Sequence, residues 1–237
     1  MTLGVKIRKA AVLGAGVMGA QIAAHLVNAD VDVMLFDLAA RDGDPLAPVS
    51  KAISGLKRLE PAPLARRDYA ERITPATYDH QIEALRDCDL IIEAVAERMD
   101  IKSGLYARIA PYIHDKAVFA TNTSGLSIDQ LARNLPEGLR SRFCGVHFFN
   151  PPRYMHLVEL IPGRATDLRI LDRLETFLVR TLGKGVVRAK DTPNFIANRI
   201  GVFSMVATMI HTDRFGLAVD LVDALTGPAI GRPKSAT

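Results

Sequence analysis

Short runs of apolar residues alternate along most of the chain with longer segments in which apolar residues recur at helical spacing. The continuous runs predict buried strands at Lys9–Leu13, Val31–Phe36, Asp89–Val95 and Ala117–Ala120. The helical spacing predicts helices at Gln21–Asn28, Val49–Leu59, Ile82–Leu85 and Asp100–Ile109. Strands that are apolar on both faces are typical of parallel sheets enclosed by helices. This order of elements predicts an α/β fold with a doubly wound, mostly parallel sheet.

The pattern changes near residue 191. Before it, strands are predicted at Phe143–Phe148, His156–Leu160 and Val186–Ala189, with a helix at Asp167–Leu182. After Asp191-Thr192-Pro193, a typical helix start, only helical spacing follows, at Phe195–Ile210 and Leu217–Leu225. We therefore expect two domains, an α/β domain at 1–190 and the start of an all-α domain at 191–237.

A glycine-rich turn joins the first predicted strand to the first helix. It runs Gly14-Ala15-Gly16-Val17-Met18-Gly19. In a dinucleotide-binding unit the first glycine permits a tight turn, the second lets the backbone approach the pyrophosphate, and the third lets the helix pack closely. The helix N-terminus adds unpaired N–H groups and a positive dipole end. The turn, with Val17 and Met18 inside it, predicts a Rossmann-type dinucleotide site.

Asp37 ends the second predicted strand, about twenty residues after the glycines. A carboxylate at this place accepts hydrogen bonds from the adenosine ribose diol, and it would repel a 2′-phosphate. The expected cofactor is therefore NAD rather than NADP.

Composition narrows the class of protein and partner. Apolar residues make up 49% and charged residues 24%, as in soluble globular proteins. No apolar run reaches the length of a membrane span, and the first strand begins almost at once, so we expect neither a membrane span nor a signal or transit peptide. Cys88 and Cys144 lie in apolar, strand-like sequence, so we expect no disulfide framework and a cytoplasmic location. The sequence predicts no metal site.

The formal net charge of +4 raises the question of an anionic partner. The basic residues are dispersed and lack interleaved aromatic residues, which argues against nucleic acid. A substrate that carries several phosphates accounts for the charge more simply.

Polar residues gather just after the predicted strands, where ligands bind in folds of this class. They are Glu97 with Lys102, Thr121-Asn122-Thr123-Ser124, His147-Phe148-Phe149-Asn150-Pro151, Glu159 and, in the helical domain, Asn198-Arg199. This set brings a histidine, carboxylates, a hydroxyl and amides to the place where a nicotinamide would lie.

These motifs, in this order and over nearly the whole chain, resemble those of the L-3-hydroxyacyl-CoA dehydrogenases. Related 3-hydroxyacid dehydrogenases share the glycine motif but generally carry a lysine in place of the His-Phe-Phe-Asn-Pro segment. The resemblance implies oxidation of a (3S)-3-hydroxyacyl-CoA to the 3-ketoacyl-CoA with NAD, in fatty-acid β-oxidation. It also implies a homodimer in the full-length protein.

The resemblance implies catalytic roles for four residues. His147 would be the general base that takes the 3-hydroxyl proton, a task for which the near-neutral pKa of free imidazole is suited. Glu159 would hold the other ring nitrogen and stabilise the imidazolium. Ser124 and Asn198 would hydrogen-bond the substrate oxygens on which charge develops.

Further residues would hold the cofactor and the CoA. By resemblance, Glu97, Lys102 and Asn122 would line the nicotinamide-ribose side. Asn150 lies near enough in its motif to orient His147 or the substrate, and it is also a candidate for binding the cofactor. Lys51 and Lys57, which lie on a basic predicted helix, are candidates for CoA phosphates from charge alone. A solvated helix face is the alternative interpretation of these lysines.

Simpler structural roles compete with these assignments. Ser124 could be the N-cap of a helix that begins near Ser127, and Asn198 could be an ordinary helical amide. The other histidines fit packing or capping positions, and they are His25, His80, His114, His156 and His211.

The chain departs from the family pattern at a few places. Asn194 stands where the family often has glycine, and Phe203 where proline or alanine is common. These differences resemble long bifunctional members that carry an enoyl-CoA hydratase module. Because the family's helical domain is larger than 191–237, we expect the chain to be truncated. Two other functions stay open, a 3-ketoacyl-CoA reductase of biosynthesis and a non-catalytic NAD-binding or structural protein.

Overall fold

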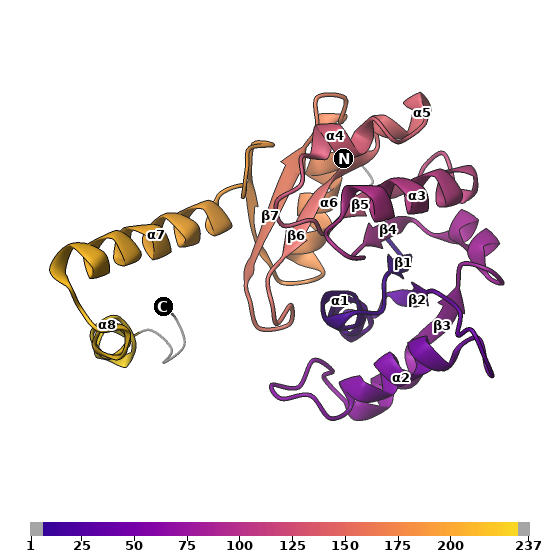
Figure 1. The fold of residues 1–237 in the computed structure, drawn as a ribbon. Helices are drawn as coiled ribbons and strands as arrows, with labels where there is room; N and C mark the ends of the chain where they lie inside the picture. Colours follow the sequence, from indigo (N-terminus) through magenta and orange to yellow (C-terminus); the bar gives the residue numbers. More distant parts are fainter. Residues whose placement is uncertain (1–6, 232–237) are drawn as a thin grey trace. The chain divides into compact units, whose positions relative to one another are not determined.

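The computed structural model describes residues 7–231, and within them the strands form one eight-stranded sheet (Figure 1). The strand order is β3-β2-β1-β4-β5-β6-β7-β8. The strands are β1 (Lys9–Leu13), β2 (Asp32–Asp37), β3 (Ile73–Thr77), β4 (Leu90–Glu93), β5 (Val118–Thr121), β6 (Phe143–Phe148), β7 (Leu157–Pro162) and β8 (Gly185–Arg188). Among these strands only β6 and β7 pair antiparallel. The predicted doubly wound, mostly parallel sheet is confirmed.

Helices cover both faces of this sheet. They are α1 (Val17–Asn28), α2 (Ala47–Leu56), α3 (Met99–Ile109), α4 (Ile128–Ala132), α5 (Glu137–Arg140) and α6 (Leu168–Arg180). Short 3-10 turns lie at η1 (Arg67–Arg72), η2 (Ile82–Asp87) and η3 (Ala110–Tyr112). The connections between the parallel strands therefore carry helical segments, as a crossover requires.

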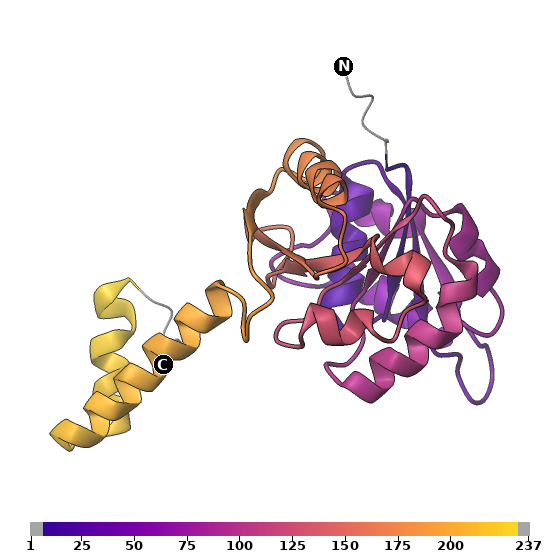
Figure 2. The same cartoon turned by 90° about the horizontal axis from the view of Figure 1, so that it is seen from above.

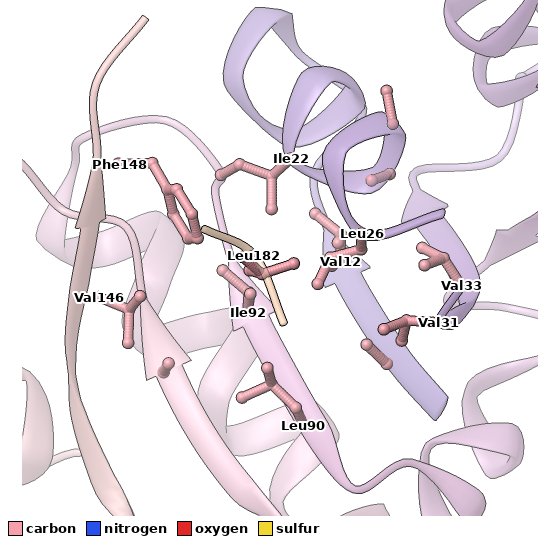
Figure 3. Packing of buried hydrophobic residues seen from close by; sticks show 14 of the residues in the cluster. Val12, Ile22, Leu26, Val31, Val33, Leu90, Ile92, Val146, Phe148 and Leu182 are labelled. Carbon is pink, nitrogen blue, oxygen red and sulfur yellow. The ribbon is translucent and has the colours of Figure 1, made fainter. Parts of the chain in front are cut away.

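One face of the sheet packs against α1, α2 and α6. Alternate strand residues point to this side, so that Val12 and Ile92 belong to the same buried cluster as Ile22 and Leu26 of α1. Figure 3 shows these side chains between the helix and the strands, with Phe148 of β6 beside Ile22. The buried cluster fixes α1, and with it the turn that precedes α1, on the edge of the sheet.

The opposite face packs against α3 and α4. Tyr106 of α3 meets Phe119 and Phe143 with ring centroids 5.0 and 5.7 Å apart. Gly145 of β6 leaves room for Ile128 of α4, because a Cβ at this glycine would lie 2.9 Å from the Ile128 side chain. Strand residues such as His147, two positions after Gly145, share this face.

The edge strand β3 was not expected from the apolar pattern. It carries Pro75 at its centre and pairs in parallel with β2 alone. Proline cannot donate to a ladder and is found in sheets mainly at edges, so its presence hides the strand from a pattern based on apolar runs.

The chain divides into two compact units, residues 1–193 and 194–237. The second unit contains α7 (Ala197–Phe215), α8 (Val219–Thr226) and the turn η4 (Pro228–Ile230). Helices α7 and α8 lie side by side in Figure 2, and residues of both line an apolar groove. No helix within residues 7–231 has the length and apolar character of a membrane span.

Helix α7 begins two residues later than the pattern predicts. Asn194 and Phe195 adopt left-handed backbone conformations, with φ of 63° and 48°. Asparagine tolerates this region far better than most residues other than glycine, which explains an asparagine at a position where glycine is common.

Candidate active site

The carboxyl ends of the parallel strands meet at one edge of the sheet. Strand β1 lies between β2 and β4, so the direction of the chain across the sheet reverses there. Open α/β sheets bind ligands at such a switch point. The glycine turn follows β1, and Asp37, Glu93, Thr121 and Phe148 end four of the other strands.

The three glycines of the turn have three different environments. Gly14 has φ of +106°, which side chains rarely permit. A Cβ at Gly19 would lie 1.8 Å from the Gly14 carbonyl oxygen, so α1 packs directly against its own turn. A Cβ at Gly16 would meet no atom within 4 Å, and this residue is exposed. The backbone at Gly16 is therefore open to a ligand.

The N-terminus of α1 is available to an anion. Among the described residues no side chain caps α1, and no acidic residue lies in its first turn. Val17, its first residue, is 69% exposed. Exposed N–H groups and the positive end of the helix dipole suit a pyrophosphate, so the turn fits a dinucleotide.

Asp37 supports the turn as well as marking the end of β2. Its Oδ2 accepts a hydrogen bond of 2.6 Å from the Ala15 N–H, and its Oδ1 accepts one of 2.7 Å from the Leu38 N–H. A carboxylate has about four acceptor sites, so capacity for a ribose diol remains.

His147 and Glu159 form a buried pair in the antiparallel part of the sheet. They are directly opposed residues of β6 and β7, and His147 Nδ1 lies 2.8 Å from Glu159 Oε2. Both side chains are almost fully buried. A carboxylate at this place accepts from Nδ1–H and leaves Nε2 as the basic nitrogen.

Asn122 and Phe149 brace the segment that carries His147. Asn122 Oδ1 accepts a 2.8 Å hydrogen bond from the Phe148 N–H, which ties the end of β5 to the end of β6. The Phe149 ring packs against the His147 ring with centroids 4.5 Å apart. The first contact holds the backbone that carries His147, and the second limits the orientations open to its ring.

Asn150 connects the same segment to α1. Its Oδ1 accepts a 3.0 Å hydrogen bond from Gln21 Nε2, one turn into the helix that follows the glycines. The dinucleotide turn and the histidine strand are therefore linked through one side-chain contact.

Glu97 is bound to the loop after β5. Its Oε1 accepts from the Thr123 hydroxyl and from the N–H groups of Ser124 (2.9 Å) and Gly125 (3.0 Å). Burial acts to raise the pKa of Glu97, but the Thr123 hydroxyl, the Lys102 charge and the two amides together hold this pKa below its ordinary value. Glu97 is therefore an anion bound to the loop, with its side chain still 41% exposed.

Lys102 binds mainly to Glu93 and not to Glu97, the carboxylate that its spacing in the sequence suggests. Its ammonium lies 2.6 Å from Glu93 Oε1 and 3.6 Å from Glu97, and its side chain is 1% exposed. Glu93 also accepts from the hydroxyls of Tyr106 (2.9 Å) and Thr121 (2.7 Å). Burial and the Glu93 charge raise the pKa of Tyr106 well above its ordinary value, so the phenol stays a donor.

Asp191 caps a different helix from the one that the helix-start pattern predicts. Its carboxylate accepts from the Ile128 and Asp129 N–H groups, both at 2.9 Å, and from the Ser127 hydroxyl at 2.8 Å. These donors lie at the start of α4, whereas the predicted helix, α7, begins only at Ala197. Ser127, not Ser124, is the N-cap of α4.

The remaining candidates lie at more exposed places. Ser124 is exposed on the loop that Glu97 holds, and Asn198 lies in the first turn of α7 in the second unit. Lys51 projects from α2 and is exposed. Lys57 follows α2 and pairs with Glu71 at 3.3 Å, so part of its charge is already matched.

Three other titratable groups of the first unit are buried, and their pKa values are shifted toward the neutral form. Burial, together with the Lys184 charge, lowers the pKa of His25 to about 4, so this histidine is neutral at neutral pH. Burial raises the pKa values of the Cys88 and Cys144 thiols to about 12. The described residues contain no group of three or more potential metal ligands.

Sequence reasoning missed Glu93, Tyr106 and Asp191. A usable indication existed for Glu93, because an acid at the end of an apolar strand requires a cation or several donors when it is buried. No pattern along the chain indicates that Asp191 meets α4, since the contact joins residues more than sixty positions apart.

Comparison with known proteins gives concordant results. Residues 9–192 match the family model described as 3-hydroxyacyl-CoA dehydrogenase, NAD binding domain. A probable 3-hydroxyacyl-CoA dehydrogenase of Deinococcus radiodurans is 42% identical over 233 residues, covering 98% of this chain and 67% of that protein. A putative fatty acid oxidation complex trifunctional enzyme of Rickettsia felis is 45% identical over 199 residues, covering 84% of this chain and 28% of that protein.

A solved structure agrees in fold. The crystal structure of M. tuberculosis FadB2 superposes with a TM-score of 0.82 at 29% identity, covering 96% of this chain and 79% of that one. The chain thus spans about two thirds of the Deinococcus relative and less than a third of the Rickettsia relative.

Proposed function

The chain belongs to the 3-hydroxyacyl-CoA dehydrogenase family and contains its NAD-binding domain, and from that premise we propose that it oxidises a (3S)-3-hydroxyacyl-CoA to the 3-ketoacyl-CoA. His147 is the general base of this reaction, and Glu159 orients it. The contact between His147 Nδ1 and Glu159 Oε2 at 2.8 Å carries the proposal, because it assigns a tautomer and a charge partner to one imidazole at a strand end.

The glycine turn and Asp37 hold the cofactor. The open backbone at Gly16 and the uncapped start of α1 receive the pyrophosphate, and Asp37 receives the adenosine ribose. NAD supplies a hydride acceptor for the hydrogen on C3 of the substrate.

His147 moves one proton in the step. As the hydride leaves C3, the proton of the 3-hydroxyl passes to Nε2, and the C–O bond becomes a carbonyl. The ring becomes an imidazolium beside the buried Glu159 carboxylate, which stabilises the new charge far better there than it would in water. Ser124 and Asn198 donate to the substrate oxygens, and Lys51 and Lys57 attract the CoA phosphates.

The test is production of NADH by the intact protein with NAD and (3S)-3-hydroxybutyryl-CoA, with the 3R isomer as control. We expect turnover with the 3S isomer only. His147→Gln preserves a polar side chain of similar reach but cannot take a proton, so kcat should fall by about 10²–10⁴-fold while the Kd for NAD stays within about twofold. NAD binding without turnover in the unchanged protein would refute the proposal.

We assign the reaction to fatty-acid β-oxidation. We also propose that the protein acts in the cytoplasm and that the full protein is a homodimer. The name of the Rickettsia relative supports the first point. Helix α7 supports the last, because Ile200, Phe203, Met209 and Ile210 are each at least 59% exposed, and large exposed apolar patches mark association surfaces. Sedimentation of the intact protein tests the dimer, and a monomer at micromolar concentration would contradict it.

A further inference from the structure

The segment from Thr123 to Asp129 is held at both ends by carboxylates from distant parts of the chain. Glu97, just after β4, receives the N–H groups of Ser124, Gly125 and Leu126 at 2.9, 3.0 and 3.3 Å. Asp191, after β8, receives those of Ile128 and Asp129. Five backbone N–H groups within six residues therefore point to two carboxylates.

Hydroxyl groups of the same segment complete the two attachments. Thr123 donates to Glu97, and Ser127 donates to Asp191. Hydrogen bonds to charged acceptors are roughly twice as strong as neutral ones, so each carboxylate restrains its end of the segment strongly. Ser124 is exposed, and it belongs to the part of the segment that Glu97 holds through the backbone N–H groups.

The Glu97 carboxylate is itself held by a buried cation, Lys102. The Lys102 ammonium lies 3.6 Å from Glu97 and is fixed by Glu93 at the end of β4. A buried cation at this place compensates the Glu97 charge and limits where the carboxylate can move. Contacts therefore lead from Glu93 in the sheet through Lys102 and Glu97 to the loop that carries Ser124.

The Asp191 attachment joins the loop to the C-terminal end of the first unit. Asp191 lies just before the second unit begins at Asn194. The last residues of the first unit are therefore bound to the start of α4 through Asp191.

We propose that Glu97 and Asp191 are positioning residues, which act through the backbone of residues 124–129 to fix the Ser124 hydroxyl toward the substrate. The inference rests on the proposed function, because Ser124 needs a substrate oxygen to contact. Neither carboxylate has to touch the substrate. A displacement of about 1 Å in such a contact costs on the order of 10²-fold in rate, so the loss of one attachment should lower kcat strongly.

Asp191→Asn removes the charge and one of the two accepting oxygens while it preserves size. Its matched control is Asp89→Asn. Asp89 is also half-buried and also accepts two backbone N–H groups, those of Arg8 (2.8 Å) and Lys9 (3.1 Å). It lies just before β4, at the amino ends of the parallel strands and away from the candidate site. Both variants remove a carboxylate charge that faces two backbone N–H groups, and only the Asp191 contacts lead to the Ser124 loop.

We expect Asp191→Asn in the intact protein to lower kcat by at least about tenfold with the Kd for NAD within about twofold, whereas Asp89→Asn leaves kcat within about twofold. Hydrogen exchange of the peptide that covers residues 124–129 should accelerate in Asp191→Asn and in Glu97→Gln, and it should be unchanged in Asp89→Asn.

A double-mutant cycle tests whether the effect passes through Ser124. If it does, Ser124→Ala combined with Asp191→Asn loses no more rate than Ser124→Ala alone. Multiplying effects, or unchanged exchange at 124–129, would overturn the inference. Absence of turnover in the unchanged protein would refute the proposed function instead, and the exchange measurement would still decide whether the two attachments hold the loop.

Discussion

His147 and Glu159 are directly opposed across β6 and β7, with 2.8 Å between Nδ1 and Oε2. In an antiparallel pair, opposed residues point to the same face, and a shift of register by one residue sends one of them to the other face. The pairing of the two strands therefore fixes the partner of the imidazole. The geometry of this candidate dyad is a property of the sheet and not of a flexible loop.

Glu159→Gln tests the charge at this partner. Glutamine can still accept from Nδ1–H, but it cannot stabilise an imidazolium as a carboxylate does. We expect kcat to fall by about 10–10²-fold with little change in the Kd for NAD, measured by NADH formation and by calorimetry. Glu175→Gln, in an exposed pair with Arg188, is the control and should leave kcat unchanged. Equal rates in the two variants would remove Glu159 from the mechanism.

The glycine turn offers a matched pair of substitutions. Gly19→Ala would place a Cβ 1.8 Å from a backbone oxygen, so we expect a loss of about 3 kcal/mol or more in the free energy of unfolding. Gly16→Ala meets no atom within 4 Å and has an ordinary φ of −70°, so its stability should change by less than about 0.5 kcal/mol.

The same Gly16→Ala variant should nevertheless bind NAD at least about tenfold more weakly, because the methyl group occupies the approach to the pyrophosphate. Urea unfolding and calorimetric titration give the two readouts. Unchanged NAD affinity would show that the pyrophosphate does not pass over Gly16.

Asp37→Ala is expected to weaken NAD binding by about tenfold or more and to reduce the preference for NAD over NADP. The Kd values of both cofactors, measured side by side, are the readout. Because Asp37 also accepts from the Ala15 N–H, some destabilisation of the turn accompanies the loss. Asp32→Ala, at the exposed start of the same strand, is the control. A preference for NADP in the unchanged protein would contradict the assignment and favour a biosynthetic reductase.

Lys102→Met leaves the buried Glu93 carboxylate without its cation. Breaking a buried pair by removing one partner costs about 3–5 kcal/mol, and we expect a loss of that size in urea unfolding. Lys9→Met breaks a more exposed pair with Asp87 and should cost at most about 1 kcal/mol. If both variants unfold at the same urea concentration, Lys102 has no structural role and its direct contact with the cofactor becomes the better interpretation.

The parts of the fold that the sequence predicts are those with local causes. The strands around Val12, Leu35 and Ile92 are continuous apolar runs, and the glycine turn follows from backbone constraints that glycine alone meets. Strand β3 escapes this reasoning because Pro75 interrupts its pattern, and only its pairing with β2 makes it a strand.

The candidate site divides in the same way. The place of His147 at a strand end is local information, but the choice of Glu93 as the main partner of Lys102 depends on how α3 packs over β4. Spacing along the helix suggests Glu97, five residues before Lys102, whereas the shorter contact reaches back nine residues. Asp191 is the extreme case, because its donors lie more than sixty positions away along the chain and only the tertiary fold brings them together.

Pro75 has a consequence for how this molecule behaves in a crowded solution. The backbone N–H of Tyr78, just after β3, donates to the carbonyl oxygen of Asp37 in β2. The alternate residues Thr77 and Pro75 therefore direct their backbone groups away from β2, toward the open edge of the sheet. Gln81 occupies both outward groups of Thr77, accepting from its N–H at 2.8 Å and donating to its carbonyl at 3.0 Å. Pro75 has no N–H to offer. The β3 edge of the sheet therefore lacks the row of free donors that an incoming strand needs, which guards this edge against edge-to-edge aggregation.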